Sequence, residues 1–472
     1  MSPTTADISS LAATFSGRLI GPGDADYDQV RAVHNGVVDK RPALIARCRG
    51  VADIVDAVKF ARQTNMPVAV RGGGHNVAGR AAIEGGLLID LSLLKGVQVD
   101  PSARTARAQG GVTWGEFNRE TQLHALATTG GVVSTTGISG LTLGGGLGWL
   151  LGQCGLAVDN LRSVEIVTAD GTVLTTSAEE NADLFWAVRG GGGNFGIAAS
   201  LEYRLHPIGP VVHGGAVMHP FAVAEDLLRF YRDFTAACAD DLTVFCGFLH
   251  APDGSGMKLA AMVACYAGPP DRADAALAPL KAFGSPVVDI MGPIPYCQLN
   301  TLFDASLPRG ARNYWKSTFL SSLSDNAIRT IVDIYASCDS PMSQVLIEHS
   351  HGAATRVAAD ATAFAHRSAG YNFLILGQWM EAADDQRVMS WTRQRYQDIQ
   401  PFAAAARYGN YLDHDDAVEM AYGANYARLQ EIKAKYDPDN FFRQNLNVKP
   451  ATDSARAAHP STRSAASPPA TM

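Results

Sequence analysis

The sequence lacks the marks of a membrane, secreted or nucleic-acid-binding protein. It contains no run of about 18 apolar residues, so we expect no transmembrane helix. Residues 1–17, MSPTTADISSLAATFSG, show no basic region followed by a long apolar stretch, so we expect no secretory signal and a cytoplasmic location. A net charge of −7 gives no general attraction to nucleic acid or to an anionic membrane.

Cysteine is scarce and its spacing is irregular. The seven cysteines are an odd number and form no C-x-x-C pair, which argues against a disulfide framework. We therefore expect reduced thiols at all seven positions, Cys48, Cys154, Cys238, Cys246, Cys265, Cys297 and Cys338.

Glycine, in contrast, is abundant, and much of it is clustered. Among the 46 glycines, four dense stretches fall in the first 200 residues: RGGGHNVAG (71–79), GISG (137–140), LGGGLG (143–148) and RGGGGNFG (189–196). Clustered glycines indicate positive φ angles or a backbone that approaches a ligand closely. Gly191, Gly193 and Gly196 match G-x-G-x-x-G, but a helix is expected before them and a strand after, the reverse of a nicotinamide-dinucleotide site. A P-loop pattern, G-x-x-x-x-G-K-[ST], does not occur.

The RGGGH stretch follows a predicted strand, PVAVR (67–71). Amide groups freed by Gly72, Gly73 and Gly74 can form a nest around a diphosphate, with Arg71 adding positive charge. The alternative is a plain tight turn with a surface His75. Several such loops in one region favour a bound dinucleotide.

The patterns divide the chain into four segments. Residues 1–208 read as one α+β domain, with a helix at 51–65, strands at 67–71 and 85–92, hairpins at 96–111 and 163–177, and a helix at 113–127. Residues 209–405 read as a second domain that includes strands at 242–249 and 371–379. Residues 406–450 contain one helix, with Tyr422, Tyr426, Leu429 and Ile432 at helical spacing and Asp437-Pro438 at its end. Residues 451–472, rich in Ala, Ser, Pro and Thr, are expected to be disordered.

Four longer motifs resemble a known family. RGGGHNVAG followed by GGLLIDLS is similar to the PCMH-type FAD-binding domain of the vanillyl-alcohol-oxidase superfamily. GLAVDNLRSVEIVTADG (155–171), LFWAVRGGGGNFGI (184–197) and the stretch from Tyr422 to Pro450 narrow the resemblance to berberine-bridge-enzyme-like flavin oxidases. It implies an α+β fold: a PCMH-type FAD-binding domain of two α/β subdomains (1–208, completed by 406–450) and a mixed α/β substrate domain with an antiparallel sheet.

The resemblance also assigns the cofactor. It implies FAD bonded through its 8α carbon to His75, as in singly linked bacterial members. A second link through Cys154 is not expected, since the linking position of doubly linked relatives falls at Val133. The residues assigned to FAD are Arg71, Gly72, Gly73, Gly74, His75, Asn76, Gly79, Thr136, Gly137, Gly140, Gly144, Gly145, Gly148, Asp159, Asn160, Gly196, Ile197, Asn445 and Asn447.

The catalytic residues are less evident. Tyr411, in RYGNYLDHDD, and Thr136, at the family's oxygen-gate position, are the first candidates. The strand glutamate or glutamine of some relatives is replaced by Leu374, so we turn to Asn372 on the same predicted strand, although an amide is a weak base. A tyrosine, water or an already deprotonated substrate remain alternatives for the proton acceptor.

Metal binding is a further possibility. Asp413, His414, Asp415 and Asp416 precede a helix and are more typical of capping residues, while His349 and His351 lack a third ligand. No metal is expected.

The resemblance implies an FAD-dependent oxidase. It would take hydride from a small organic substrate, such as an alcohol, an amine or a secondary metabolite, and return the electrons to O2 as hydrogen peroxide. An oxygenase acting through a flavin N5 adduct and a non-catalytic flavin or metabolite carrier are the alternatives. We expect no nucleic-acid or membrane partner and a monomer or homodimer.

Overall fold

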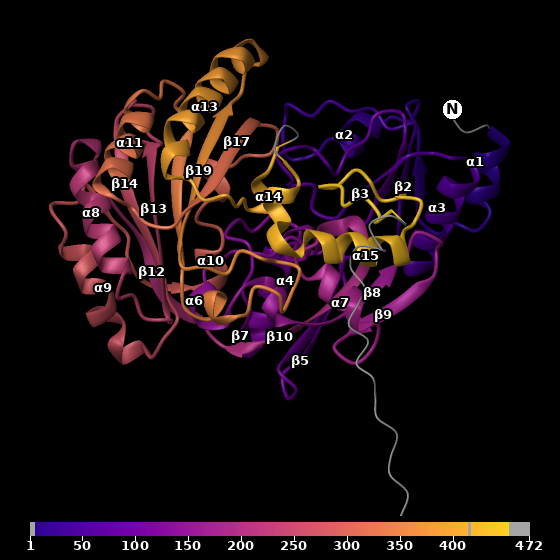
Figure 1. Cartoon of the computed structure of the whole chain (residues 1–472), viewed down its shortest axis with the longest axis horizontal. Coiled ribbons are helices and arrows are strands. Elements are labelled where there is room, and N and C mark those ends of the chain that lie inside the picture. Colours follow the sequence, from indigo (N-terminus) through magenta and orange to yellow (C-terminus); the bar gives the residue numbers. More distant parts are fainter. Residues whose placement is uncertain (1–4, 414–416, 453–472) are drawn as a thin grey trace, which may run out of the picture.

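The computed structural model describes residues 5–413 and 417–452. Within these residues the chain forms a four-stranded, a five-stranded and an eight-stranded sheet, together with a two-stranded ribbon. The eight-stranded sheet lies on one side of the molecule and the two smaller sheets on the other, with the C-terminal helices beside the smaller sheets (Figure 1). The predicted disorder of residues 451–472 falls almost wholly outside the described residues, as do three of the four residues weighed as a metal cluster, 414–416.

The first sheet is built by the segment that carries the RGGGH loop. Its order is β1-β2-β4-β3, with β2, β4 and β3 parallel and β1 antiparallel at the edge. Helix α3 (Val51–Gln63) buries Ile54 and Val58, so the predicted helix and the two strands beside it are confirmed. The strands are β1 (Arg18–Ile20), β2 (Leu44–Arg47), β3 (Val68–Arg71) and β4 (Leu87–Asp90), and the remaining helices are α1 (Thr5–Ala12) and α2 (Tyr27–Arg31).

The second sheet is antiparallel, in the order β5-β6-β10-β8-β9. Both predicted hairpins are present, and Gly171 takes a φ of +83° in the turn between β8 and β9. The helix predicted over 113–127 is shorter than expected, because Ala125 takes a left-handed φ of +52° that ends it before β7. The strands are β5 (Val97–Asp100), β6 (Thr105–Gln109), β8 (Leu161–Val167), β9 (Val173–Ser177) and β10 (Ile197–Arg204), and β7 (Leu126–Ala127) pairs with β11 (His206–Pro207). The helices are α4 (Trp114–Thr121), α5 (Ile138–Leu143), α6 (Leu151–Cys154) and α7 (Ala182–Val188).

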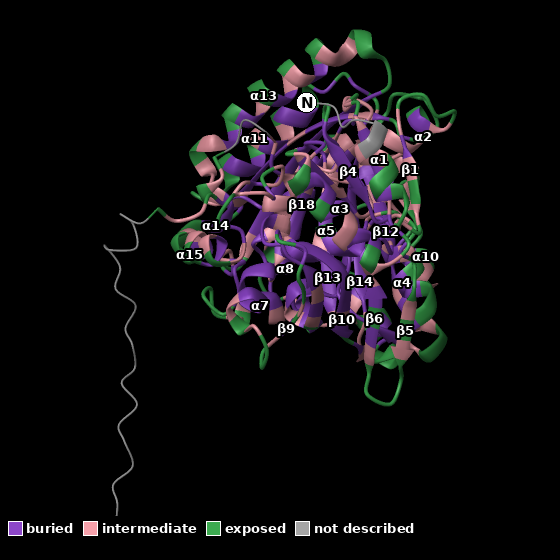
Figure 2. Cartoon of the chain, turned by 90° about the vertical axis from the view of Figure 1, so that its right-hand side faces the viewer, coloured by how far each residue is buried: buried purple, intermediate pink, exposed green. Residues whose placement is uncertain are grey.

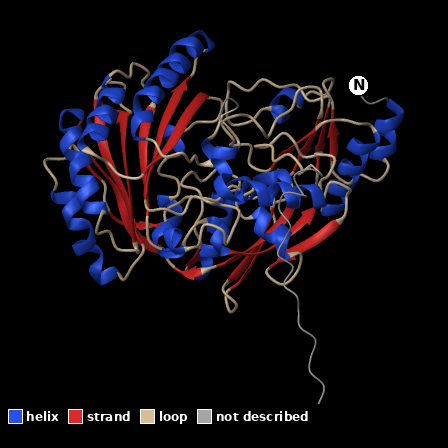
Figure 3. Cartoon of the chain, viewed as in Figure 1, coloured by secondary structure: helices blue, strands red, loops and turns tan. Residues whose placement is uncertain are grey.

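The largest sheet is antiparallel, in the order β15-β12-β14-β13-β18-β19-β17, with β16 beside β12. Its strands are β12 (Val211–Pro220), β13 (Leu242–His250), β14 (Lys258–Tyr266), β15 (Val288–Asp289), β16 (Gly292–Pro295), β17 (Arg312–Leu320), β18 (Gln344–Ser350) and β19 (Gly370–Trp379). Four longer helices cover one face (Figures 1 and 3). They are α8 (Ala224–Thr235), α9 (Ala273–Ala282), α11 (Asp325–Ala336) and α13 (Asp385–Ile399), while α10 (Tyr296–Leu299) and α12 (Ala353–Arg356) are short.

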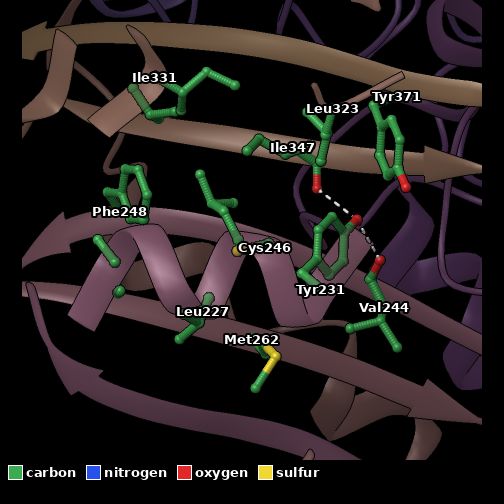
Figure 4. Close-up of a cluster of buried hydrophobic side chains, with 14 of the residues drawn as sticks. Leu227, Tyr231, Val244, Cys246, Phe248, Met262, Leu323, Ile331, Ile347 and Tyr371 are labelled. Carbon is green, nitrogen blue, oxygen red and sulfur yellow. Dashed lines mark hydrogen bonds between the residues drawn. The ribbon is translucent and has the colours of Figure 1, made fainter. Parts of the chain in front are cut away.

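The alternation of side chains along β18 gives this sheet two different faces. Val345 and Ile347 enter the hydrophobic cluster beneath α8 and α11, where the Tyr231 hydroxyl donates to the carbonyl of Ile347 (Figure 4). Because successive strand residues point to opposite sides, Gln344 and Leu346 lie on the other face, which we call the inner face. Buried residues are concentrated in the strands of all three larger sheets (Figure 2).

The C-terminal segment differs from the prediction of one continuous helix. It forms α14 (Glu419–Tyr422) and α15 (Tyr426–Tyr436), separated at Gly423, which takes a φ of +51°. The break leaves the Tyr422 and Tyr426 rings stacked 6.1 Å apart. None of the helices in the described part of the chain is both long and apolar enough to cross a bilayer.

A buried lysine fastens α15 to the RGGGGNFG loop. The Lys433 ammonium donates to the carbonyls of Asn194 (2.6 Å) and Phe442 (3.0 Å) and pairs with Asp437 (2.6 Å). Both charged side chains are fully buried. Asn194 in turn accepts from the Val448 amide at 3.1 Å, so the loop and the C-terminal segment hold each other in place.

Lys433→Met is expected to lower the unfolding midpoint strongly, because it leaves Asp437 buried and unpaired, a loss on the order of 3–5 kcal/mol. The matched control is Lys435→Met, since Lys435 forms an exposed ion pair with Asp183 and such pairs contribute little. Thermal unfolding followed by circular dichroism compares the two. Equal midpoints for both variants would show that the buried pair does not fasten this segment.

Candidate functional site

A cavity of about 280 Å³ lies between the glycine loops and the inner face of the eight-stranded sheet. All four predicted glycine stretches contribute to its wall. The residues predicted to bind the cofactor that line it are Gly72, Gly73, Gly74, His75, Asn76, Thr136, Gly137, Gly140, Gly144, Gly196, Ile197 and Asn445.

The RGGGH and GISG loops meet backbone to backbone. A Cβ atom on Gly73 would collide with the amide nitrogen of Gly137, and one on Gly137 would collide with that of Gly73. Gly74 takes a φ of +71°, a conformation that other residues rarely adopt. Glycine at these three positions is thus required by the loop itself.

The same loop presents unused hydrogen-bond donors. The backbone amides of Gly73, Gly74, His75 and Asn76 donate to no other residue in the described part of the chain. Consecutive free amides of this kind form an anion-binding nest, which suits a diphosphate. A Cβ on Gly140 would meet open space, so that wall leaves room for a ligand. The chemistry of this surface fits FAD.

His75 is held from two sides. Its Nε2 lies 2.7 Å from the Thr135 hydroxyl, and its ring packs against that of His34, with centroids 3.9 Å apart and planes tilted by 31°. His34 is itself positioned by the Leu307 carbonyl, 3.0 Å from its Nε2. Burial lowers the pKa of His75 to about 3, so the imidazole is neutral and keeps a lone pair on one nitrogen. Thr136 lies next to it, with its hydroxyl 3.5 Å from Nδ1.

Other residues assigned to the cofactor lie behind the wall. The Arg71 guanidinium pairs with the fully buried Asp90 at 2.7 Å, and the Asp159 carboxylate pairs with Arg367 at 2.8 Å. The Asn160 amide donates to the Cys154 carbonyl at 2.8 Å. These side chains support the loops that line the cavity. The remaining positions outside the lining are Gly79, Gly145, Gly148 and Asn447.

The inner face carries a buried acid that the sequence interpretation missed. Glu348 accepts from the Asn372 amide at 2.6 Å and from the Tyr411 hydroxyl at 3.2 Å. Tyr411 lines the cavity, so its hydroxyl joins the cavity to the carboxylate behind it. The structure thus brings together the predicted Tyr411 and Asn372 through a third residue. The one sequence signal was an acidic residue inside the apolar run VLIE (345–348).

Burial governs the protonation of this group. It raises the pKa of Glu348 to about 7, and the hydrogen bonds from Asn372 and Tyr411 reduce that rise. Burial, followed by the charge of Glu348, also raises the pKa of Tyr411 well above its usual value. The tyrosine is therefore neutral, and the glutamate is the group that exchanges a proton near neutral pH.

Two neighbouring polar residues have structural partners. The Tyr408 hydroxyl accepts from the amides of Gly146 (3.1 Å) and Leu147 (3.2 Å). The Asn410 amide donates to the Leu141 carbonyl at 3.0 Å. Tyr408 thus fastens the segment before Tyr411 to the LGGGLG loop, and Asn410 fastens it to α5.

The cysteines and the paired histidines are also placed. All seven cysteines are free thiols, and burial raises the pKa of Cys154 to about 12. The rings of His349 and His351 stack 4.7 Å apart, and burial lowers the pKa of His349 to about 3. Among residues 5–413 and 417–452, no group of three His, Cys, Asp or Glu side chains is arranged to hold a metal ion.

Known proteins share this architecture. A family model for an FAD binding domain matches residues 42–177, and one described as berberine and berberine like matches residues 407–449. An FAD-linked oxidoreductase of Dictyostelium discoideum is 30% identical over 446 residues, 94% of this chain and 97% of that protein. The (R)-6-hydroxynicotine oxidase of Paenarthrobacter nicotinovorans is 29% identical over 94% of this chain and 99% of its own. A crystal structure of 6-hydroxy-D-nicotine oxidase from Arthrobacter nicotinovorans has a TM-score of 0.85 at 27% identity, covering 93% of this chain and 98% of that one.

The raised pKa of Glu348 predicts a pH-dependent difference in stability. Unfolding returns the carboxyl to a pKa near 4.5, so the parent loses stability as pH rises from about 4.5 through about 7. Glu348→Gln removes that loss and is expected to be more stable relative to the parent at pH 8 than at pH 5, by on the order of 3 kcal/mol. Thermal midpoints of both proteins at the two pH values test this. A difference between the proteins that stays constant with pH would contradict it.

Proposed function

The chain belongs to the family of FAD-linked oxidoreductases with a berberine-like C-terminal segment, and from that premise we propose that it is an oxidase that holds FAD covalently through His75. The observation that carries the proposal is the neutral His75 imidazole at the wall of a cavity lined by free backbone amides. In this proposal residues 1–208 and 406–450 hold the cofactor, and residues 209–405 form the substrate side.

The cofactor is assigned to the glycine-rich wall. The amides of residues 73–76 would hold the diphosphate, and Thr136, Gly140 and Asn445 would lie along the rest of the dinucleotide. When bound, FAD accepts a hydride from a substrate carbon and passes both electrons to O2, which leaves as hydrogen peroxide.

The surroundings of His75 suit a covalent tether. Thr135, by accepting a hydrogen bond from Nε2–H, would leave the lone pair on Nδ1. His34 restricts the orientation of the ring by packing against it. A neutral, oriented imidazole is the form that can bond to the 8α carbon of the flavin. Cys154, with its pKa raised to about 12, stays a thiol and is not a second tether in this proposal.

Tyr411 and Glu348 would remove the substrate proton. Tyr411 lines the cavity, and its hydroxyl donates to Glu348. As hydride leaves the substrate carbon, the proton of the adjacent O–H or N–H passes to the tyrosine oxygen, and the tyrosine proton passes to the carboxylate. Asn372 holds the second carboxylate oxygen and so fixes the direction of the first. In this proposal Glu348, on the neighbouring strand, takes the role of the Glu or Gln that Leu374 replaces.

Pigment retention tests the tether. The purified protein is expected to keep its yellow colour and its flavin fluorescence in a denaturing gel, whereas His75→Ala is expected to release the flavin on denaturation. Cys154→Ala serves as the control and is expected to keep the flavin bound. Release of all pigment from the parent, or retention in His75→Ala, would remove the proposed tether.

The Tyr411–Glu348 pair predicts a pH profile. With any substrate that bleaches the flavin, kcat/KM is expected to rise with pH and level off above about 7, because Glu348 must be ionised to accept the proton. Glu348→Gln and Tyr411→Phe are expected to slow peroxide release by about 100-fold or more. Glu348→Asp is expected to restore part of the rate and to show the same rise of kcat/KM with pH. If kcat/KM of Glu348→Gln still rose with pH as in the parent, another group would accept the proton. Labelled oxygen from O2 in the product would indicate an oxygenase.

A further inference from the structure

The side chains of the inner face form rows across three strands. In the register of β17, β19 and β18, Trp315, Leu376 and Gln344 lie side by side, followed by a row that contains Leu374 and Leu346. The next row contains Asn372 and Glu348. The first two rows line the cavity through Trp315, Leu376, Gln344, Leu374 and Leu346, and the third lies behind Tyr411.

The middle of this wall is apolar and carries no charge. Leu346, Leu374 and Leu376 form a continuous platform, and Phe303 and Trp315 extend it. Among the described residues that line the cavity, the one charged side chain is Arg80, which belongs to the RGGGH side. A sugar ring laid on the leucines would bury several hydroxyl groups without partners, and each such burial is unfavourable.

Most polar groups on this side are already used within the protein. The Ser306 hydroxyl donates to the Phe303 carbonyl at 2.9 Å, and the Trp315 indole donates to Asn313 at 3.2 Å. Asn410 donates to the Leu141 carbonyl. The side-chain amide of Gln344, in contrast, hydrogen-bonds to no other residue that the structure describes.

The two polar groups that remain lie at opposite ends of the platform. Gln344 and Glu348 are four residues apart on one strand, which separates their Cα atoms by about 13 Å. Tyr411 occupies the Glu348 end. We propose, building on the oxidase function above, that the cavity takes a neutral, ring-bearing substrate that is polar at both ends and apolar in the middle. The end that is oxidised lies at Tyr411, the other end bonds to Gln344, and saccharides are disfavoured.

Three probes of similar length separate the contributions, each used with the anaerobic holoenzyme. 4′-Hydroxybiphenyl-4-methanol is polar at both ends, biphenyl-4-methanol lacks the distal hydroxyl, and cellobiose is polar throughout. Changes in the flavin absorption spectrum report binding, and loss of the yellow colour reports oxidation of the CH2OH group to an aldehyde, with its hydride going to FAD and its proton to Glu348 through Tyr411.

We expect the hydroxylated biphenyl to bind at least about tenfold more tightly than cellobiose. Its distal hydroxyl is expected to improve binding by about tenfold in the parent and to give no gain in Gln344→Leu. Leu346→Asn is expected to weaken both biphenyls by about tenfold, and the matched control Leu123→Asn, at an exposed position just after α4 that does not line the cavity, is expected to change nothing.

The outcomes separate this proposal from the oxidase assignment. Cellobiose binding as tightly as the biphenyls, or a hydroxyl gain that survives in Gln344→Leu, would overturn the substrate class. Cellobiose that binds as tightly and also bleaches the flavin would overturn the substrate class but leave the oxidase function intact. Biphenyls that bind as expected without bleaching the flavin would support the substrate class and count against the oxidase function.

Discussion

The close approach of two backbone segments, at Gly73 and Gly137, is the constraint on which the site depends. Neither position tolerates a Cβ, so the RGGGH and GISG loops meet at a fixed separation. His75 follows this contact by two residues and Thr136 precedes it by one, which places an imidazole and a hydroxyl at the same wall. Any change that separates the loops moves the proposed tether and the nest of free amides together.

Local sequence patterns predicted the part of the molecule around the glycine loops well. Clustered glycines, the strand before them and the hairpin at Gly171 are features of consecutive residues, and a sequence displays them directly. The C-terminal helix was predicted less well, because helical spacing on both sides concealed the break that Gly423 introduces through its positive φ. The G-x-G-x-x-G match lacks the strand–loop–helix context of a nicotinamide-dinucleotide site, since α7 precedes it and β10 follows it, and Asn194 within it accepts from the Val448 amide.

The proposed proton-transfer group could not be predicted from the sequence in the same way. Glu348, Asn372 and Tyr411 lie on separate segments, and the strand register of β18 and β19 together with the return of the chain at 409–411 brings them into contact. The strand of Leu374 carries no carboxylate on this face of the sheet. The carboxylate, Glu348, lies on the neighbouring strand of the same face. An acidic residue in a strand has several possible partners, and one sequence alone does not select among them.

The character of the wall and the strength of the base are linked. Burial raises the pKa of Glu348, and the nearest row of the platform, Leu346 and Leu374, lies beside Glu348 and Asn372 on the same face of the sheet. A wall made polar enough for a sugar would admit water, lower the pKa of the carboxylate and so make it a weaker proton acceptor. In the proposed function, the apolar surface that would select the substrate therefore also affects the proton affinity of the proposed base, and the two properties would change together under mutation.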